Sequence, residues 1–262
     1  MPEYAAAQAA GEGSKQDVLS DNWRRLEPFI RSLPAKERYD KADLLVPQTL
    51  LSQVGSVEIY YAPHHEYVNR AARIVIVGLT PGWQQMELAY RTVGRALNQG
   101  LSAEAACREA KLTARFAGSM RTNLIGMLDA LAIAARFGVP DAAALFDRDR
   151  TLLHTAAVLP QPVFAAGANY TGHRPPLLPG TVLHDLAVES LRAELAAFGS
   201  ALVIPLGRTV EQICRRLADD GVIREERCLW GFPHPSGANG HRHRQFDEAK
   251  AGMSRVLDAL DR

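Results

Sequence analysis

The chain has 262 residues, of which 47% are hydrophobic, and its 30 Lys and Arg nearly balance 29 Asp and Glu to give a net charge of +1. A chain of this size can bury one large core, and it contains no run of about 18 apolar residues that could cross a membrane. The N-terminus shows no basic segment followed by an apolar one, so we expect no secretory signal and a cytoplasmic location. We expect a monomer, and the sequence leaves its protein partners unknown.

The cysteine content argues against both a disulfide framework and a metal cluster. Cys107, Cys214 and Cys228 are odd in number and far apart in sequence, which is typical of buried thiols in a reducing compartment. The run His64-His65-Glu66 resembles a metal-binding cluster, but adjacent residues on an extended chain point in opposite directions. We therefore expect no metal and no other cofactor.

The pattern of apolar residues predicts an alternation of strands and helices. Residues 1–20 lack periodicity and predict a flexible leader, followed by a single domain over 21–262. Helices are predicted over 21–33, 85–98, 102–117, 120–137, 181–198, 208–219 and 245–260, and strands over 57–61, 72–79, 201–206 and 227–231, with one more inside 152–168. This alternation favours a mainly parallel sheet covered by helices on both faces.

Two short loops carry the clearest chemical signal. Gly78-Leu79-Thr80-Pro81-Gly82 follows a β-branched strand, and its turn leaves backbone N–H groups free to face a ligand. His234-Pro235-Ser236-Gly237 places an imidazole in a rigid turn. Ligands of such α/β folds bind beyond the carboxyl ends of the strands, where we expect the loops 78–85, 169–176 and 234–244.

Together these motifs resemble those of the uracil-DNA glycosylase superfamily. Its members carry an early G-x-x-P-G loop and a late H-P-S loop, and one branch adds the segments seen here as Val93-Gly94-Arg95-Ala96 and Asn169 to Pro176. The resemblance covers about residues 70–260 and implies a three-layer α/β/α sandwich around a mostly parallel four-stranded sheet. That branch holds an iron–sulfur cluster with four cysteines, which this chain lacks.

The resemblance implies an enzyme of base-excision repair in the bacterial cytosol or nucleoid. Such an enzyme flips uracil out of DNA and hydrolyses its N-glycosidic bond, leaving an abasic site. Two alternatives stay open: a uracil-DNA binding protein with little turnover, because the family's acidic residue is absent, and a glycosylase for another deaminated base such as hypoxanthine or xanthine.

Asn169 is the candidate that reads the base. Its amide both donates and accepts, so it can match O4 and N3–H of uracil while mismatching cytosine. The alternative is an Asn at a strand end that caps the next turn, and Asn123 is a weaker candidate for the same role.

His234 is the candidate that stabilises the leaving base. An imidazole near uracil O2 would oppose the negative charge that develops as the glycosidic bond breaks. The alternative is a structural histidine bonded to the backbone of its turn.

The first loop departs from the family. Leu79 and Thr80 stand where other branches carry an acid or an asparagine, and a hydroxyl can orient water but is a poor general base. Gln84, Gln85 and Glu87 lie just downstream, and Glu87 is the nearby carboxylate, although it could equally be a surface residue.

Other contacts with the substrate are assigned by position. The family's stacking Phe is replaced by Thr92, which leaves Trp83 or Tyr90 to stack on the base unless both are core residues. The residues placed by the resemblance against the base are Gly78, Leu79, Pro81, Gly82, Trp83, Gln84, Tyr90 and Asn169. Ser236, Gly237 and Asn239 of the late loop are candidates for contact with the DNA backbone. Arg174, Arg242 and Arg244 are further candidates because they lie beside these motifs, although the run 241–244 could instead be a solvated surface charge cluster.

Overall fold

The computed structural model describes residues 19–147 and 151–260. Nearly all of the predicted leader, residues 1–18, lies outside this part of the chain. The chain divides into two compact units. The first unit comprises the residues up to Val68, Thr80–Arg115 and Leu159–Ser190, and the second comprises Asn69–Leu79, Phe116–Val158 and the residues from Leu191 onward.

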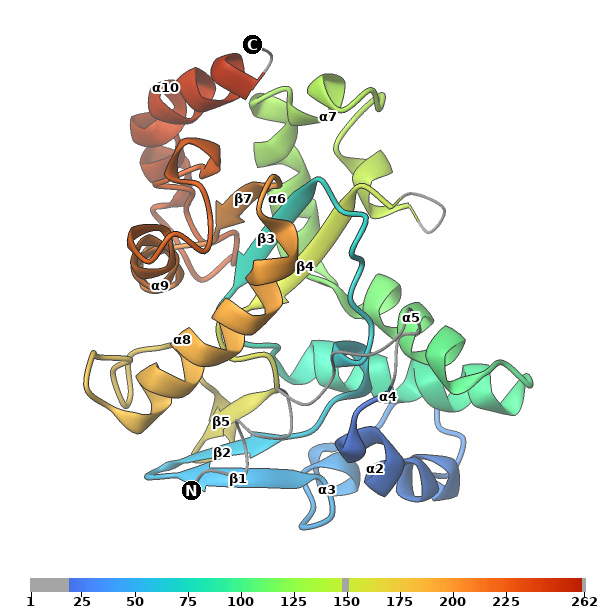
Figure 1. Ribbon diagram of the computed structural model, residues 1–262. Helices are drawn as coiled ribbons and strands as arrows, with labels where there is room; N and C mark the ends of the chain where they lie inside the picture. The colour runs from blue at the N-terminus through green and yellow to red at the C-terminus, as the bar shows by residue number, and fades with distance from the viewer. Residues whose placement is uncertain (1–18, 148–150, 261–262) are drawn as a thin grey trace. The chain divides into compact units, whose positions relative to one another are not determined.

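A parallel sheet of three strands is the centre of the second unit. Its strands are β3 (Ile74–Gly78), β4 (Leu153–Ala157) and β7 (Leu202–Pro205), and β3 lies between the other two (Figure 1). The predicted strands over 72–79 and 201–206 are confirmed. Every residue of the three strands is buried, because a parallel sheet covered on both faces selects a continuous apolar run.

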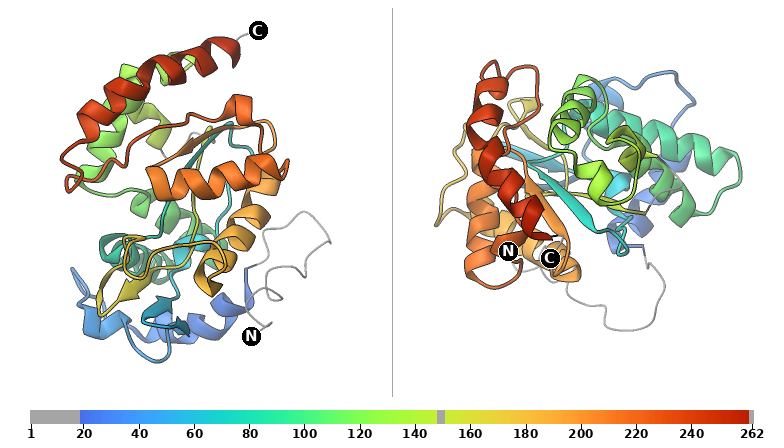
Figure 2. Two further views of the ribbon diagram at one scale, coloured as in Figure 1. Left: turned by 90° about the vertical axis from the view of Figure 1, so that its left-hand side faces the viewer. Right: turned by 90° about the horizontal axis from the view of Figure 1, so that it is seen from above.

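Helices that lie between β3 and β4 in sequence, and helices that follow β7, complete this unit. They are α6 (Ser119–Ala130), α7 (Ile133–Arg136), the short η2 (Ala143–Phe146), α9 (Arg208–Asp219), η4 (Glu225–Arg227) and α10 (Arg242–Leu260). Figure 2 shows α9 and α10, which are joined by the segment 220–241 that contains η4. The predicted helix over 120–137 is interrupted, because Ala132 adopts a left-handed conformation with φ of 51°.

The predicted fourth parallel strand over 227–231 is reduced to one bridge. Cys228 pairs in parallel with Val203, and the N–H of Leu229 donates to the carbonyl of Val203 at 2.9 Å. The segment then turns at Gly231, whose φ of 80° leaves the extended region. The four-stranded parallel sheet that we expected is therefore a three-stranded sheet extended by this single pairing among the described residues.

The first unit is a second α/β assembly with its own core. Its helices are α2 (Asp21–Ser32), α3 (Lys41–Leu44), η1 (Pro63–His65), α4 (Trp83–Asn98) and α5 (Ala103–Ala114), and α8 (Val182–Leu195) begins here and is followed by η3 (Ala196–Phe198) of the second unit. Apolar side chains of α2, α4 and α5 pack together, with Trp23 and Tyr90 among the largest that are fully buried.

An antiparallel sheet in the first unit was not predicted. Its strands are β1 (Leu50–Val54), β2 (Val57–Tyr60), β5 (Val163–Ala165) and β6 (Ala168–Asn169), paired in that order. Asn169 therefore ends an antiparallel hairpin, and the expectation that it follows a strand of the parallel sheet was wrong. The whole is a mixed α/β fold with one parallel and one antiparallel sheet.

The remaining expectations concern the helices and the cysteines. None of the described helices has the length and apolar character needed to cross a membrane. All three cysteines are buried and free, and burial raises the pKa of each thiol, to about 12 for Cys228.

Candidate functional site

Asn169 caps a helix that is distant in sequence. Its Oδ1 accepts a hydrogen bond of 2.9 Å from the backbone N–H of Trp83, the first residue of α4. The N-cap residue of α4, Gly82, has no side chain that could accept this bond. The capping role that we considered as an alternative is therefore present, but α4 is not the turn that follows Asn169 along the chain.

The contact with Gly82 sets the position of the amide. A Cβ atom at Gly82 would lie 3.0 Å from Nδ2 of Asn169, so a larger residue would push the amide away. The hydrogen bond from Trp83 fixes which side of the amide carries the oxygen. Asn169 is exposed, and Nδ2 and the second lone pair of Oδ1 are left for a ligand. The helix thus orients an amide that faces solvent.

The hydroxyl of Thr80 is used within the protein. It donates to the carbonyl of Gln161 at 2.9 Å and accepts from the N–H of Val163 at 3.2 Å. A hydroxyl has one hydrogen, and here that hydrogen is already donated. Thr80 therefore joins the first loop to the start of β5, and its role in orienting water is limited to one remaining lone pair. Pro81, the next residue, is buried.

Glu87 is neither a free base nor a surface residue. Its side chain is 4% exposed and forms an ion pair of 2.8 Å with Arg91 one turn along α4. The same carboxylate accepts from the backbone N–H of Tyr39 at 3.2 Å. Both interpretations from the sequence were wrong, because the pairing with Arg91 and Tyr39 allows a carboxylate to be buried.

The two candidate aromatic rings have different environments. Tyr90 is completely buried, and its hydroxyl donates to the carbonyl of Tyr61 at 3.0 Å, so it is a core residue and cannot stack on a base. Burial raises the pKa of Tyr90 far above its usual value. Trp83 is half-buried at the edge of the same core, and Gln84 beside it is exposed. Trp83 is the ring that remains for stacking.

The first loop begins in the second unit. Gly78 ends β3, and its carbonyl accepts from the N–H of Val158 at 3.0 Å. A Cβ at Gly78 would lie 3.4 Å from the ring of Phe116. The half-buried Leu79 follows and places an apolar side chain in the loop. The backbone at the end of β3 is thus fixed by packing on both sides.

The loop of His234 lies beyond the end of β7. A Cβ at Gly207, two residues after this strand, would lie 3.2 Å from Cβ of His234. Gly207 also has φ of 86°, which residues other than glycine rarely adopt. From α6, Asn123 donates through Nδ2 to the carbonyl of Pro235 at 2.8 Å. Asn123 therefore positions this loop.

The protonation state of His234 follows from its surroundings. Its Nδ1 accepts from the backbone N–H of Ser236 at 3.3 Å, which requires an unprotonated nitrogen. Burial lowers the pKa of His234 below its usual value because it disfavours the charged imidazolium. The imidazole is therefore neutral at pH 7, and its single hydrogen is on Nε2.

The residues after His234 differ in how free their side chains are. Oγ of Ser236 accepts from the N–H of Ala238 at 3.2 Å, which leaves its hydrogen for another acceptor. The amide of Asn239 holds this loop, because its Nδ2 donates to the carbonyl of His234 at 3.2 Å and to Gln245 at 2.9 Å. Its Oδ1 accepts from the N–H of His241 at 3.3 Å. The assignment of Asn239 to DNA stays a prediction.

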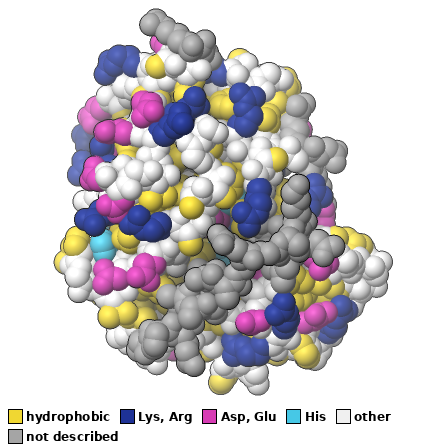
Figure 3. Space-filling view, viewed as in Figure 1, with side chains coloured by type: hydrophobic (Ala, Val, Ile, Leu, Met, Phe, Trp, Pro, Cys, Tyr) yellow, Lys and Arg dark blue, Asp and Glu magenta, His cyan; other side chains and the backbone are white. Residues whose placement is uncertain are grey.

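Positive charge is present in both units. Arg242 and Arg244 lie at the start of α10, where Arg244 is exposed at 3.8 Å from Glu248, and the exposed Arg174 belongs to the first unit. Figure 3 shows one face, on which Lys and Arg side chains are interspersed with Asp and Glu.

Sequence reasoning missed three positioning residues. Gly207 was visible as a glycine directly after a predicted strand, a signal of close backbone approach. The positioning roles of Gln161 and Asn123 could not be predicted from the neighbouring sequence, because the residues that they contact are distant along the chain.

Comparison with known proteins identifies the family. The model of the uracil DNA glycosylase superfamily matches residues 65–259. The uncharacterized protein YoxB of Bacillus subtilis (strain 168) is 44% identical over 218 residues, which cover 83% of this chain and 85% of YoxB. The chain belongs to the uracil-DNA glycosylase superfamily. Membership indicates a DNA glycosylase whose substrate is DNA, and the name of YoxB assigns no base.

Proposed function

We propose that this protein excises uracil from DNA by hydrolysis of the N-glycosidic bond. In the reaction the bond between C1′ and N1 breaks and its electron pair stays on the base. The oxygen of water bonds to C1′, and the protons of water are shared between the new hydroxyl and the released uracil. The observation that carries the choice of uracil is the orientation of the Asn169 amide by the N–H of Trp83.

Asn169 recognises the base through complementary donors and acceptors. With Nδ2 donating to O4 and Oδ1 accepting from N3–H, the amide pairs with uracil. Cytosine has an amine at position 4 and no hydrogen on N3. Its N4 amine would therefore face the donor Nδ2, and its N3 lone pair would face the acceptor Oδ1. The bond from Trp83 prevents the amide from rotating to suit cytosine, because rotation would place Nδ2 against a backbone N–H. A buried mismatched pair costs about 1–3 kcal/mol.

His234 stabilises the leaving base without transferring a proton. Its neutral imidazole donates through Nε2–H toward O2, where charge develops. The bond from Ser236 to Nδ1 keeps this tautomer, and Gly207 and Asn123 hold the loop in place. Removal of one such donor typically costs about 100-fold to 1,000-fold in rate.

Water activation is weak in this proposal. The loop 78–82 contains no carboxylate, Thr80 has already donated its hydrogen, and Glu87 is paired with Arg91. Water therefore attacks after the bond to the base is largely broken, and the rate depends on stabilisation of the leaving group. The same observation favours the second candidate, a uracil-DNA binding protein with little turnover.

One experiment separates these functions. The purified protein is incubated with labelled single-stranded and double-stranded oligonucleotides that carry one uracil, hypoxanthine or xanthine. Alkali then cleaves abasic sites, and a denaturing gel resolves the products. We expect a shorter band with uracil alone. A shorter band with hypoxanthine or xanthine instead would change the assigned base, and DNA retained by the protein without cleavage would favour the binding protein.

A further inference from the structure

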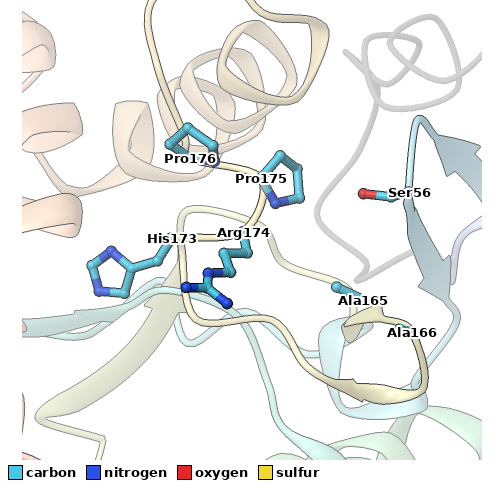
Figure 4. A pocket seen from close by; sticks show the side chains of 7 residues that line it. All are labelled: Ser56, Ala165, Ala166, His173, Arg174, Pro175 and Pro176. Carbon is cyan, nitrogen blue, oxygen red and sulfur yellow. The ribbon is translucent and has the colours of Figure 1, made fainter.

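A groove in the first unit lies beside the hairpin that carries Asn169. It has a volume of about 510 Å³ and is lined by Ser56 of the β1–β2 turn, by Ala165 at the end of β5, by Ala166 of the turn that follows, and by the segment 173–176 (Figure 4). In this view the hydroxyl of Ser56 faces the groove from the side opposite Pro175. The walls are mostly apolar, formed by alanine methyl groups and two proline rings.

The loop that forms one wall is held firmly from behind. The hydroxyl of the buried Tyr170 donates to the carbonyl of Pro175 at 2.7 Å. The N–H of the buried Leu177 donates to the carbonyl of Gly172 at 3.2 Å, and His173 pairs with Pro176. The shape of the wall is therefore present before any ligand binds, which lowers the entropic cost of binding.

Arg174 supplies a charge that the protein itself does not use. Its guanidinium is exposed, and it forms no hydrogen bond or ion pair within residues 19–147 and 151–260. Figure 4 shows Arg174 at the edge of the groove, while the ring of His173 points away from it. A guanidinium beside a flat apolar wall fits a ligand with a planar ring and an anionic group, and a nucleotide has both.

We propose that this groove binds a nucleotide of the substrate strand that neighbours the excised uracil, with its base against the prolines and its phosphate on Arg174. This inference rests on the proposed function. Ala165, which lines the groove, follows Phe164 along β5, and Phe164 pairs with Asn169 across the hairpin, so the groove begins one residue along the strand from the residue opposite Asn169. Successive nucleotides are about 3.4 Å apart along a duplex and further apart in an extended strand, so the groove is within reach of a close neighbour.

This arrangement has a consequence for the choice of substrate. A base in a duplex has its faces covered by its neighbours, so it can enter the groove only after it is unstacked and unpaired. In single-stranded DNA that cost is small. The groove therefore favours single-stranded DNA over duplex DNA.

The test uses the full chain and two independent groove variants. Arg174→Ala removes the charge, and Ser56→Phe fills the groove from an exposed turn. Arg38→Ala is the matched control, because Arg38 is an exposed arginine of the same unit outside the groove. Fluorescence anisotropy measures the Kd for a short uracil-free oligodeoxythymidine. Excision assays compare kcat/KM for single-stranded oligonucleotides in which uracil has neighbours on both sides or stands at one end.

We expect both groove variants to raise the Kd for oligodeoxythymidine about tenfold, while Arg38→Ala leaves it unchanged. We also expect both to reduce the advantage in kcat/KM of the substrate with neighbours. Equal effects of Arg174→Ala and Arg38→Ala, or an unchanged Kd for Ser56→Phe, would overturn the groove assignment. Absence of excision by the wild type would refute the proposed function instead, and the anisotropy measurement would still decide whether the groove binds a nucleotide.

Discussion

Oδ1 of Asn169 accepts a hydrogen bond of 2.9 Å from the backbone N–H of Trp83, although the two residues are 86 positions apart. One side chain therefore caps a helix and also presents an oriented amide to solvent. The two roles can be separated experimentally, because an aspartate at this position keeps the acceptor and loses the donor.

Substitution of Asn169 tests the capping role through stability. Asn169→Ala removes the acceptor for Trp83, and we expect the free energy of unfolding to fall by about 1 kcal/mol, as for other N-caps. Asn169→Asp retains an acceptor at the positive end of α4 and should leave stability unchanged or slightly higher. Urea unfolding of both variants measures this. Equal losses for Ala and Asp would show that the cap is not the source of the stability.

Thr80 is expected to act through the position of the first loop. Thr80→Val removes both hydrogen bonds to the segment 161–163, leaving a carbonyl and an N–H without a partner, and should cost about 1–3 kcal/mol of stability. Thr80→Ser keeps the hydroxyl and should restore both stability and single-turnover excision rate. If Thr80→Val retains full stability but loses excision, the hydroxyl acts on water directly.

The pH dependence of excision should report the neutral state of His234. Burial lowers the pKa of this imidazole below 6.5, so it gains a proton only in acid. We expect the single-turnover rate to be level above pH 6.5 and to fall as the pH decreases below it. His234→Gln should lower the rate and remove this dependence. A wild-type rate that increases on acidification through pH 6 would show that the imidazolium is the active form.

The same titration affects stability. The unfolded chain binds a proton at the usual pKa of a histidine, near 6.5, whereas the folded protein binds it at a lower pH. Between these two values the unfolded state holds more protons, so the free energy of unfolding decreases as the pH falls. The difference in the free energy of unfolding between the wild type and His234→Gln, measured from pH 7 to pH 5, gives the contribution of His234. This measurement is the control that shows whether a lower rate in acid reflects unfolding.

Gly207 is expected to position His234. Its φ is 86°, and a Cβ there would lie 3.2 Å from Cβ of His234, so Gly207→Ala should displace the imidazole. Gly221→Ala is the matched control, because Gly221 also has a positive φ, of 73°, with nothing within 4 Å. Both should lose about 1–3 kcal/mol of stability through backbone strain. A lower kcat is expected for Gly207→Ala alone, and an equal decrease for both would exclude a positioning role.

The sequence predicted elements whose signal is local. The run of β-branched residues in β3 and the apolar period of α9 are set by their own composition, and both are found at the predicted places. Strand β6 has two residues, and its pairing with β5 depends on tertiary contacts, so no pattern revealed it. The structural partners of Thr80 and Glu87 also depend on tertiary contacts, because Gln161 and Tyr39 lie far from them in sequence. Without these partners, both side chains were considered for chemical roles.

The most direct test of the central claim is base discrimination by Asn169. Single-turnover excision is measured on single-stranded oligonucleotides that carry one uracil or one cytosine as the only candidate base, for the wild type and Asn169→Asp. We predict that the wild type excises uracil alone. The variant, whose carboxyl group can pair with the amine of cytosine, should lose most of its preference for uracil. Unchanged selectivity in a folded Asn169→Asp variant would contradict the assignment of Asn169 as the reader of the base.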